Sequence, residues 1–169
     1  MEKKTTWNPH GFVAAVIRRC ADETAFRAAM RRAVNPSTAS FAWEHLVAWC
    51  DISKERERLP FALIGAAVAD ALPEADGNAN LGELLRKCCP SAKEEDMERE
   101  KRRLRRILSC DSVAELCNVL RPTLKYLQSK SVQIGYARLL SDILYFSDKV
   151  KLRWAESFYG NRNEEKTDE

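Results

Sequence analysis

The sequence predicts an all-α protein, a compact bundle of about eight to nine helices. Apolar residues recur three and four positions apart along most of the chain, which is the spacing that one face of a helix requires. The 169 residues contain only six glycines and six prolines, and stretches of alternating β-branched residues are few. A chain of this length buries about 70% of its unfolded surface, which is enough for one self-sufficient core.

In the N-terminal half we expect a helix over residues 9–21 and another that ends before Asn35. Asp22 is the expected N-cap of this second helix, and Ser37 or Ser40 that of a third, because their short side chains can accept a hydrogen bond from a free backbone N–H. Pro60, which has no N–H to leave unpaired, suits the first turn of a helix that continues through residues 63–72.

Residues 73–80 are rich in Asp, Asn, Gly and Pro and are expected to form a loop before a short helix over residues 81–89. Ser91 and Glu94 have the spacing of a capping box, which opens the helix that carries most of the arginines. Residues 110–112 interrupt this helix and cap the next one. Two final helices are expected over residues 132–146 and 148–159.

We expect residues 1–159 to form a single all-α domain and residues 160–169, which are polar and acidic, to form a disordered tail. The alternative is two helical sub-bundles that meet near residues 89–93. The longest weakly polar stretch, residues 59–72, contains Asp70 and is too short to span a bilayer. The first six residues lead into no signal-peptide core, so we expect a cytoplasmic location and no membrane partner.

Cations are concentrated between Arg99 and Arg153. This segment contains 13 Lys and Arg against 5 Asp and Glu, a net charge of +8, whereas the whole chain carries only +3. Such an asymmetry indicates a face that binds a polyanion and not a generally basic protein. The alternative is a solvated helical face that has no partner.

The densest run of arginines lies on the predicted helix that follows Glu94. At 100° per residue, one side of that helix carries the arginines of a stripe, which are Arg99, Arg102, Arg103 and Arg106. The opposite side is apolar. Like charges three and four residues apart repel by a few tenths of a kcal/mol per pair, and an anionic partner relieves that repulsion. Phosphate backbones are the commonest partner of this kind.

Motifs that carry enzymatic or metal chemistry are missing from the sequence. It has no glycine-rich phosphate loop, no nucleophile elbow and no HExxH motif, and the carboxylates of its basic half are isolated from one another. The six cysteines include no CxxC pair, and His10 and His45 have no ligand partners at metal-site spacing. We therefore expect buried free thiols, no metal, no cofactor and no catalytic residue.

Several segments resemble one protein family in their order and spacing. Residues 101–122 have the sequence KRRLRRILSCDSVAELCNVLRP, and GYARLLSDILYF and VKLRWAESFY follow it. FRAAMRRA and NLGELL precede it. Together these segments resemble the CasB family, the small helical subunit of the type I-E CRISPR surveillance complex Cascade, over residues 12–159.

The resemblance implies a non-catalytic all-α protein, of which two copies lie head to tail along Cascade. Its implied partners are the CRISPR RNA, the target and non-target DNA strands, a second copy of itself and the other Cascade subunits, which are CasA-, CasC-, CasD- and CasE-like. There the basic surface supports the RNA–DNA hybrid and steadies the displaced strand of the R-loop in antiviral defence. We expect the isolated protein to bind nucleic acid weakly, with strong salt dependence and no sequence preference.

The family's basic positions fall on residues of both halves of this chain. They are Arg31, Arg32, Arg102, Arg103, Arg121, Arg138, Lys151 and Arg153. Ser109 stands where the family has a further cation, and Arg105 and Arg106 are expected to compensate for it. Arg106, which also belongs to the arginine stripe, completes the expected nucleic-acid-binding set. Most aromatic residues are expected in the core or at subunit contacts, although exposed rings can stack on bases.

Two other classes of protein fit the pattern. One is an all-α protein-interaction adaptor whose cations meet an acidic protein. The other is a helix-turn-helix regulator that inserts residues 102–106 into a major groove, but this segment has no Asn or Gln beside its arginines for adenine contacts. Neighbouring CasA-like and CasC-like genes would distinguish the Cascade subunit from both.

Overall fold

The computed structural model describes residues 6–91 and 93–160, and within these ranges it contains nine α-helices and no strand. The helices are α1 (Pro9–Asp22), α2 (Thr24–Arg31), α3 (Ser40–Leu46), α4 (Glu55–Ala71), α5 (Leu81–Lys87), α6 (Glu94–Leu108), α7 (Val113–Ser129), α8 (Tyr136–Leu144) and α9 (Asp148–Tyr159). The all-α class and the expected number of helices are confirmed. No helix of these ranges is both long enough and apolar enough to cross a membrane.

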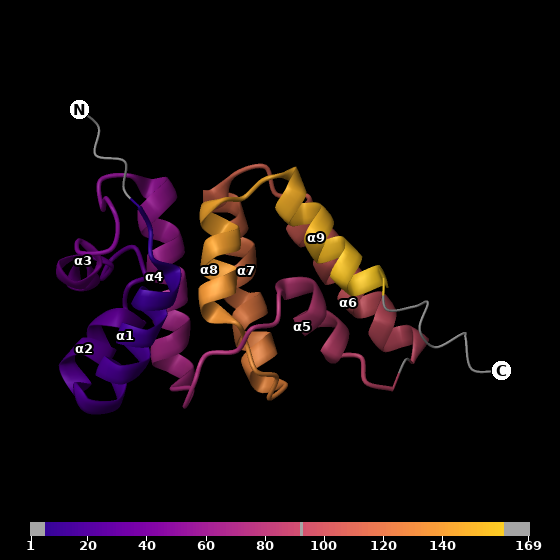
Figure 1. Ribbon diagram of the computed structural model, residues 1–169, viewed down its shortest axis with the longest axis horizontal. Helices are drawn as coiled ribbons and strands as arrows, with labels where there is room; N and C mark the ends of the chain where they lie inside the picture. The colour runs from indigo at the N-terminus through magenta and orange to yellow at the C-terminus, as the bar shows by residue number, and fades with distance from the viewer. Residues whose placement is uncertain (1–5, 92, 161–169) are drawn as a thin grey trace.

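Helix α4 lies at the centre of the helices at one end of the molecule. Every residue from Pro60 to Ala69 is buried, and the helix packs against α1, α2, α3, α7 and α8. Its small residues allow these helices to approach closely. At Gly65, for example, an added Cβ would lie only 2.1 Å from the side chain of Met30. Figure 1 shows α1–α4 on the left, with α7 and α8 beside them.

The other end of the molecule is built from α5, α6 and α9 (Figure 1). α5 packs against both α6 and α9, and α6 also contacts α7. The contact between α5 and α9 is very close, because the carbonyl oxygen of Trp154 lies 2.0 Å from where a Cβ on Gly82 would stand. One connected cluster of buried side chains includes residues from all nine helices. The single domain over residues 1–159 stays a prediction, and the expected tail lies, apart from Gly160, outside the described residues.

Two of the expected caps in the first half are wrong. Asp22 is the last residue of α1, and Glu23 occupies the N-cap position of α2 without a capping bond. The side chain of Glu23 pairs instead with Arg19 at 2.8 Å. α3 starts at Ser40, and its N-cap residue is Ala39, whose side chain has no oxygen to accept a hydrogen bond. Ser37 instead donates its hydroxyl to the side chain of Asn35 in the preceding turn.

Pro60 is also not in the first turn of its helix, since α4 begins five residues earlier at Glu55. The carboxylate of Glu57 explains the earlier start. It accepts hydrogen bonds from the indole of Trp7 at 3.1 Å and from the backbone N–H of Asp51 at 3.0 Å. This network holds the first turn in place, and the acidic residues of that turn face the positive end of the helix dipole.

The expected capping box of α6 is wrong as well. Lys93 is the N-cap residue and makes no side-chain cap, while three acidic residues in the first turn of α6 interact favourably with the helix dipole. A capping box does occur at α5, where the side chains of Asn80 and Glu83 each accept from the other's backbone N–H. The predicted cap at residues 110–112 is confirmed, since Ser112 accepts from the N–H of Glu115 at the start of α7.

α8 starts at Tyr136 and not at residue 132. The carboxylate of Asp76, in the loop before α5, accepts from the N–H of Tyr136 at 2.7 Å and from that of Ala137 at 3.1 Å. The N–H of Gly77 also donates to the carbonyl of Ile134. The backbone therefore pairs with a distant loop at Ile134, and the helix begins only at Tyr136.

Candidate nucleic-acid interface

Three of the expected binding arginines, which are far apart in the sequence, lie around one groove. Arg31 and Arg32 come from the C-terminal end of α2, and Arg121 comes from the middle of α7. Side chains of α4 form the floor between them. The groove has a volume of about 430 Å³ and is open to solvent. We call it the basic groove.

The α7 wall of the basic groove contains a cation that was not among the expected binding residues, Lys125. Arg121, Lys125 and Gln128 are spaced i, i+4 and i+7, so they share one face of the helix. This spacing was visible in the sequence. The sequence did not show that the end of α2 faces this side of α7.

The positive charge of the basic groove is only partly compensated. Arg31 pairs with Asp70 across the groove, with 2.7 Å between Nε and Oδ1, and both side chains remain partly exposed. Arg121 donates to the carbonyl of Val34 at 3.3 Å, which ties α7 to the segment after α2. Among the described residues, no carboxylate is within ion-pair distance of Arg32, Arg121 or Lys125. Four cations and one carboxylate therefore face an anion that enters.

The arginine stripe of α6 divides into two sets in the structure. Met97, Leu104 and Ile107 are buried as predicted, but Glu100 is buried beside them with no exposed surface. Arg99 and Arg103 turn toward this carboxylate. The other arginines of the helix are exposed, and Arg102 donates to the carbonyl oxygen of Glu98 within its own helix. Arg99 is exposed as well but pairs with Asp96 and Glu100, so among the described residues the exposed arginines of α6 without a carboxylate partner are Arg102, Arg105 and Arg106.

Glu100 forms a buried charge cluster between α6 and α7. Its carboxylate lies 3.3 Å from Nε of Arg99 and 3.4 Å from Nε of Arg103, and it accepts a hydrogen bond from the hydroxyl of Tyr126. The guanidinium of Arg103 stacks 3.8 Å from the centre of the Tyr126 ring. Burial, followed by the hydrogen bond to Glu100, raises the pKa of Tyr126 to about 12. Arg103, an expected binding residue, thus also anchors α6 to α7.

The three remaining expected residues lie on α8 and α9, and all three make contacts within the protein. Arg138 donates to the carbonyl of Asn78 at 2.7 Å, and Arg153 pairs with Asp142 at 3.0 Å. Asp142 is buried and also accepts from the indole of Trp154, and burial raises the pKa of this carboxyl. Lys151 lies over the ring of Phe146. The first two contacts tie α8 to the loop before α5 and α9 to α8. The structure brings none of the three residues into the basic groove.

The described residues contain no group of three or more His, Cys, Asp or Glu side chains that could hold a metal ion. All six cysteines are free and buried, as the sequence predicts. Burial raises the pKa of the thiols of Cys50 and Cys117 to about 12. These thiols therefore stay protonated and unreactive at neutral pH.

Known proteins show the same architecture. The family model described as CRISPR-associated protein Cse2 matches residues 26–159. The crystal structure of CasB from Thermus thermophilus superimposes with a TM-score of 0.69 at 23% identity, covering 92% of this chain and 99% of that one. A second crystal structure from Thermus thermophilus, that of a CRISPR-associated protein of the Cse2 family, has a TM-score of 0.70, with the same identity and coverage. No curated protein sequence matches the chain.

The match to the family model starts at Phe26, so it omits α1, whereas the resemblance in sequence was expected from residue 12. The structural matches show that the fold is shared over nearly the whole of the Thermus proteins. The family model extends over most of the chain, from α2 to the end of α9. The expected membership of the CasB family is thereby confirmed, and the chain belongs to the Cse2 family of CRISPR-associated proteins.

Proposed function

We propose that this protein is a non-catalytic small subunit of a type I-E CRISPR Cascade complex and binds nucleic acid without sequence specificity. In the cytoplasm it would stabilise the hybrid of guide RNA and target DNA, together with the displaced strand. It would do so beside a second copy of itself and the CasA-, CasC-, CasD- and CasE-like subunits. Membership of the Cse2 family supports the role in a CRISPR complex.

The basic groove is the observation that supports nucleic-acid binding. Arg31, Arg32, Arg121 and Lys125 come from two helices and face one open channel, with only Asp70 to oppose them. A guanidinium offers a planar fork that fits two phosphate oxygens. Contacts to phosphates position a strand but carry no sequence information, as a subunit that accepts any target requires. The exposed arginines of α6 provide a second positive surface.

The test reverses the charge of the groove in the full-length chain with R32E, R121E and K125E together. Binding to a fluorescent single-stranded oligonucleotide is measured by anisotropy at low salt, and retention of target DNA is measured on the assembled complex. We expect affinity to fall at least about tenfold, because one hydrogen bond to a charged group contributes about 1.5–3 kcal/mol. Unchanged binding and unchanged retention would contradict the proposal.

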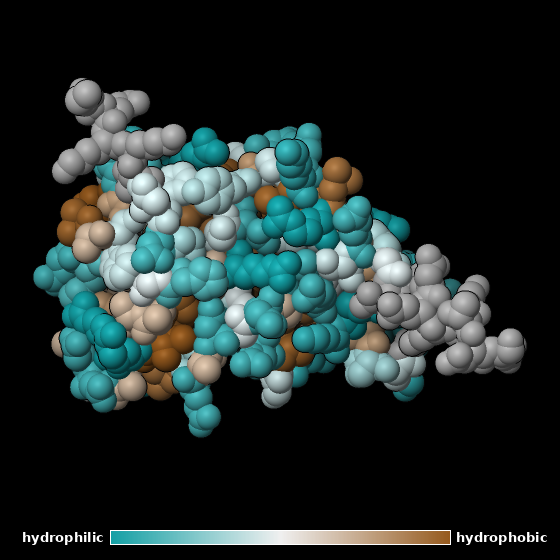
Figure 2. All heavy atoms as spheres, in the orientation of Figure 1, coloured by the Kyte–Doolittle hydropathy of each residue, from teal (hydrophilic) through white to brown (hydrophobic). Residues whose placement is uncertain are grey.

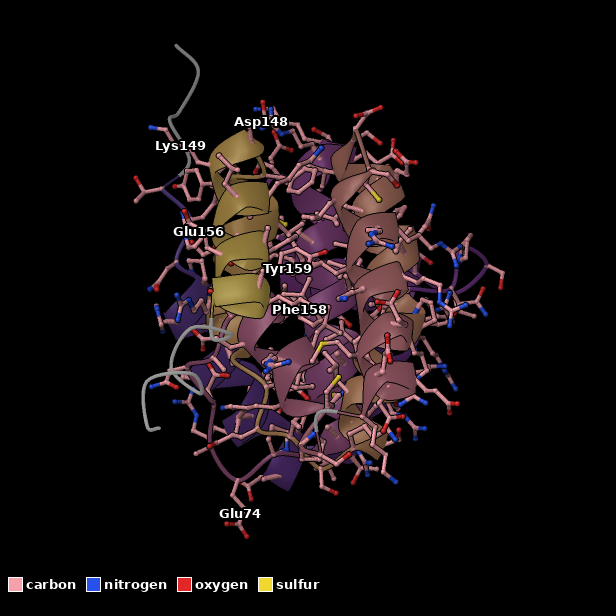
Figure 3. All side chains as sticks on the ribbon, turned by 90° about the vertical axis from the view of Figure 1, so that its right-hand side faces the viewer. Glu74, Asp148, Lys149, Glu156, Phe158 and Tyr159 are labelled. Atoms are coloured by element: carbon pink, nitrogen blue, oxygen red, sulfur yellow. The ribbon has the colours of Figure 1, made fainter. Side chains whose placement is uncertain are left out.

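A matched control changes the same amount of charge elsewhere, with R18E, K87E and K149E. All three side chains are exposed and lie outside the basic groove. Lys149 extends outward from the first turn of α9 (Figure 3). We expect this variant to bind nearly as well as the unchanged protein. If it loses as much affinity as the groove variant, net charge and not the groove is responsible. If only the groove variant fails and an acidic protein competes for the site better than DNA, the adaptor function is favoured.

A further inference from the structure

A second cavity opens directly beside the basic groove. Its volume is about 310 Å³, and it shares Val34, Leu63 and Arg121 with the basic groove. Its remaining walls are mainly apolar and come from α4, α7 and the segment between α2 and α3, with Trp43 of α3 on one side. A strand whose phosphates lie along the groove therefore passes the mouth of an apolar cavity.

Trp43 stands out among the residues of this cavity. It is 41% exposed, although it lies in an apolar wall. Phe41 of the same helix and Val47, its C-cap residue, are also exposed. Apolar surface is visible near α3, at the left edge of the molecule (Figure 2). The guanidinium of Arg58 lies 5.8 Å from the centre of the indole and donates to the carbonyl of Ile52. The ring is thus held at the rim instead of packing into the core.

The polar groups at the rim favour an occupant that is apolar in its body and anionic at one end. Arg58 and Arg121 face Glu55 as the only carboxylate of the lining, so the cavity has a net positive rim. Asn118 adds one amide, which can donate to or accept from a polar edge. A nucleotide has this combination of a flat ring and a phosphate. A purely apolar protein side chain would leave both guanidiniums without an anionic partner.

We propose that this cavity receives one unpaired nucleobase from a single strand whose phosphates lie in the basic groove, and that Trp43 stacks on that base. The inference rests on the proposed function, since it requires nucleic acid in the groove. A volume near the lower end of the ~300–1,000 Å³ range of ligand pockets suits a single base. Every base has an aromatic face, so stacking adds affinity for single strands without adding strong sequence preference.

The first experiment compares two strands of equal length and charge on the unchanged full-length protein. One is a short oligothymidylate, and the other is the same number of phosphates joined by abasic tetrahydrofuran units. We expect the thymidylate to bind about tenfold more tightly, because one base stacked on an aromatic ring contributes about 1–3 kcal/mol. The intrinsic tryptophan emission should be quenched by the thymidylate and not by the abasic strand.

The second experiment assigns the difference to Trp43. In W43A the preference for thymidylate over the abasic strand should fall to less than about twofold, and W43F should restore part of it because phenylalanine keeps an aromatic face. Y145A is the matched control, since Tyr145 is an exposed ring that lies outside both cavities. We expect Y145A to keep the full preference.

The outcomes separate this inference from the proposed function. Equal, salt-dependent binding of both strands would leave the groove in place and overturn the base pocket. A preference that survives in W43A would place the stacked base elsewhere and also overturn it. Binding of neither strand would overturn both proposals.

Discussion

Glu100 illustrates how one buried carboxylate changes the role of its neighbours. It has no exposed surface, and Arg99, Arg103 and Tyr126 surround it. The helical pattern of α6 placed Arg99 and Arg103 on the polar side and indicated that they were available for phosphates. The structure shows that they also neutralise Glu100. Their contribution to binding is therefore expected to be smaller than that of the exposed arginines beside them.

Replacing Glu100 by Gln tests this interpretation. We expect E100Q to lower the free energy of unfolding by about 2–4 kcal/mol, less than the ~3–5 kcal/mol for breaking a fully buried pair because both arginines reach solvent. Urea denaturation provides the measurement. E98Q is the control, since the side chain of Glu98 is 46% exposed and pairs with Lys101 within one turn of the same helix, and such pairs contribute under about 1 kcal/mol. Equal losses of unfolding free energy in E100Q and E98Q would contradict the interpretation that Glu100 holds a buried charge cluster together.

The buried thiols and Tyr126 make stability depend on alkaline pH. Burial raises the pKa of Cys117 from 9.0 to about 12. Between these values the folded state keeps a proton that the unfolded state releases, so the free energy of unfolding falls as pH rises and is largest below pH 9.0. Tyr126 acts in the same direction above pH 10.0. Urea titrations through this range should show the fall, and it should be shallower in C117A. A free energy of unfolding that rises with pH through this range would exclude the buried thiols and Tyr126 as the cause.

At the scale of the elements, the helices follow from local periodicity but several of their ends do not. Ser112 caps α7 from the adjacent residue, and this cap was predictable. The start of α8 was not, because Asp76 binds its first N–H groups from a position 60 residues earlier. Hydrophobic spacing describes one helix at a time, whereas such a cap exists only once the loop and the helix have packed together.

Replacing two aspartates in turn tests the difference between a cap expected from the sequence and one that only packing creates. D76A should lower the free energy of unfolding by about 1–2 kcal/mol, because it removes the acceptor of two backbone N–H groups at the start of α8. D22A should change stability by less than about 0.5 kcal/mol, because Asp22 is exposed at the end of α1 and does not cap α2. Chemical denaturation of both variants gives the comparison. A larger effect in D22A would restore the cap expected from the sequence.

The contact between α5 and α9 predicts the effect of adding one methyl group. Alanine at position 82 gains about 1 kcal/mol of helix propensity. Its Cβ, however, would meet the backbone carbonyl of Trp154 at 2.0 Å, so one of the helices must shift. We expect G82A to be destabilised by a net of about 1–3 kcal/mol in thermal or urea unfolding. In G160A the added Cβ meets nothing within 4 Å, and that variant should unfold like the unchanged protein.

At the scale of the whole molecule, the basic groove predicts how binding depends on salt. Four cations and one carboxylate suggest about three neutralised phosphates, which corresponds to a slope of log K against log salt of about −2 for a single strand. K125A should make that slope shallower by about 0.7, since one phosphate contact is lost. K87A, which changes an exposed cation outside the groove, should leave the slope unchanged. Anisotropy titrations at several salt concentrations measure both, and a salt-independent affinity would contradict phosphate binding.

The sequence by itself determined the helical class, the course of most helices, the concentration of cations in the second half and the resemblance to the CasB family. All of these depend on the order of residues along the chain. Only the tertiary structure decided which cations share a surface. It brought Arg31 and Arg32 of α2 opposite Arg121 and Lys125 of α7, while Arg103 and Arg153 became partners of buried carboxylates. The physical reason is that charges on different helices meet only through packing, which periodicity within one helix does not specify.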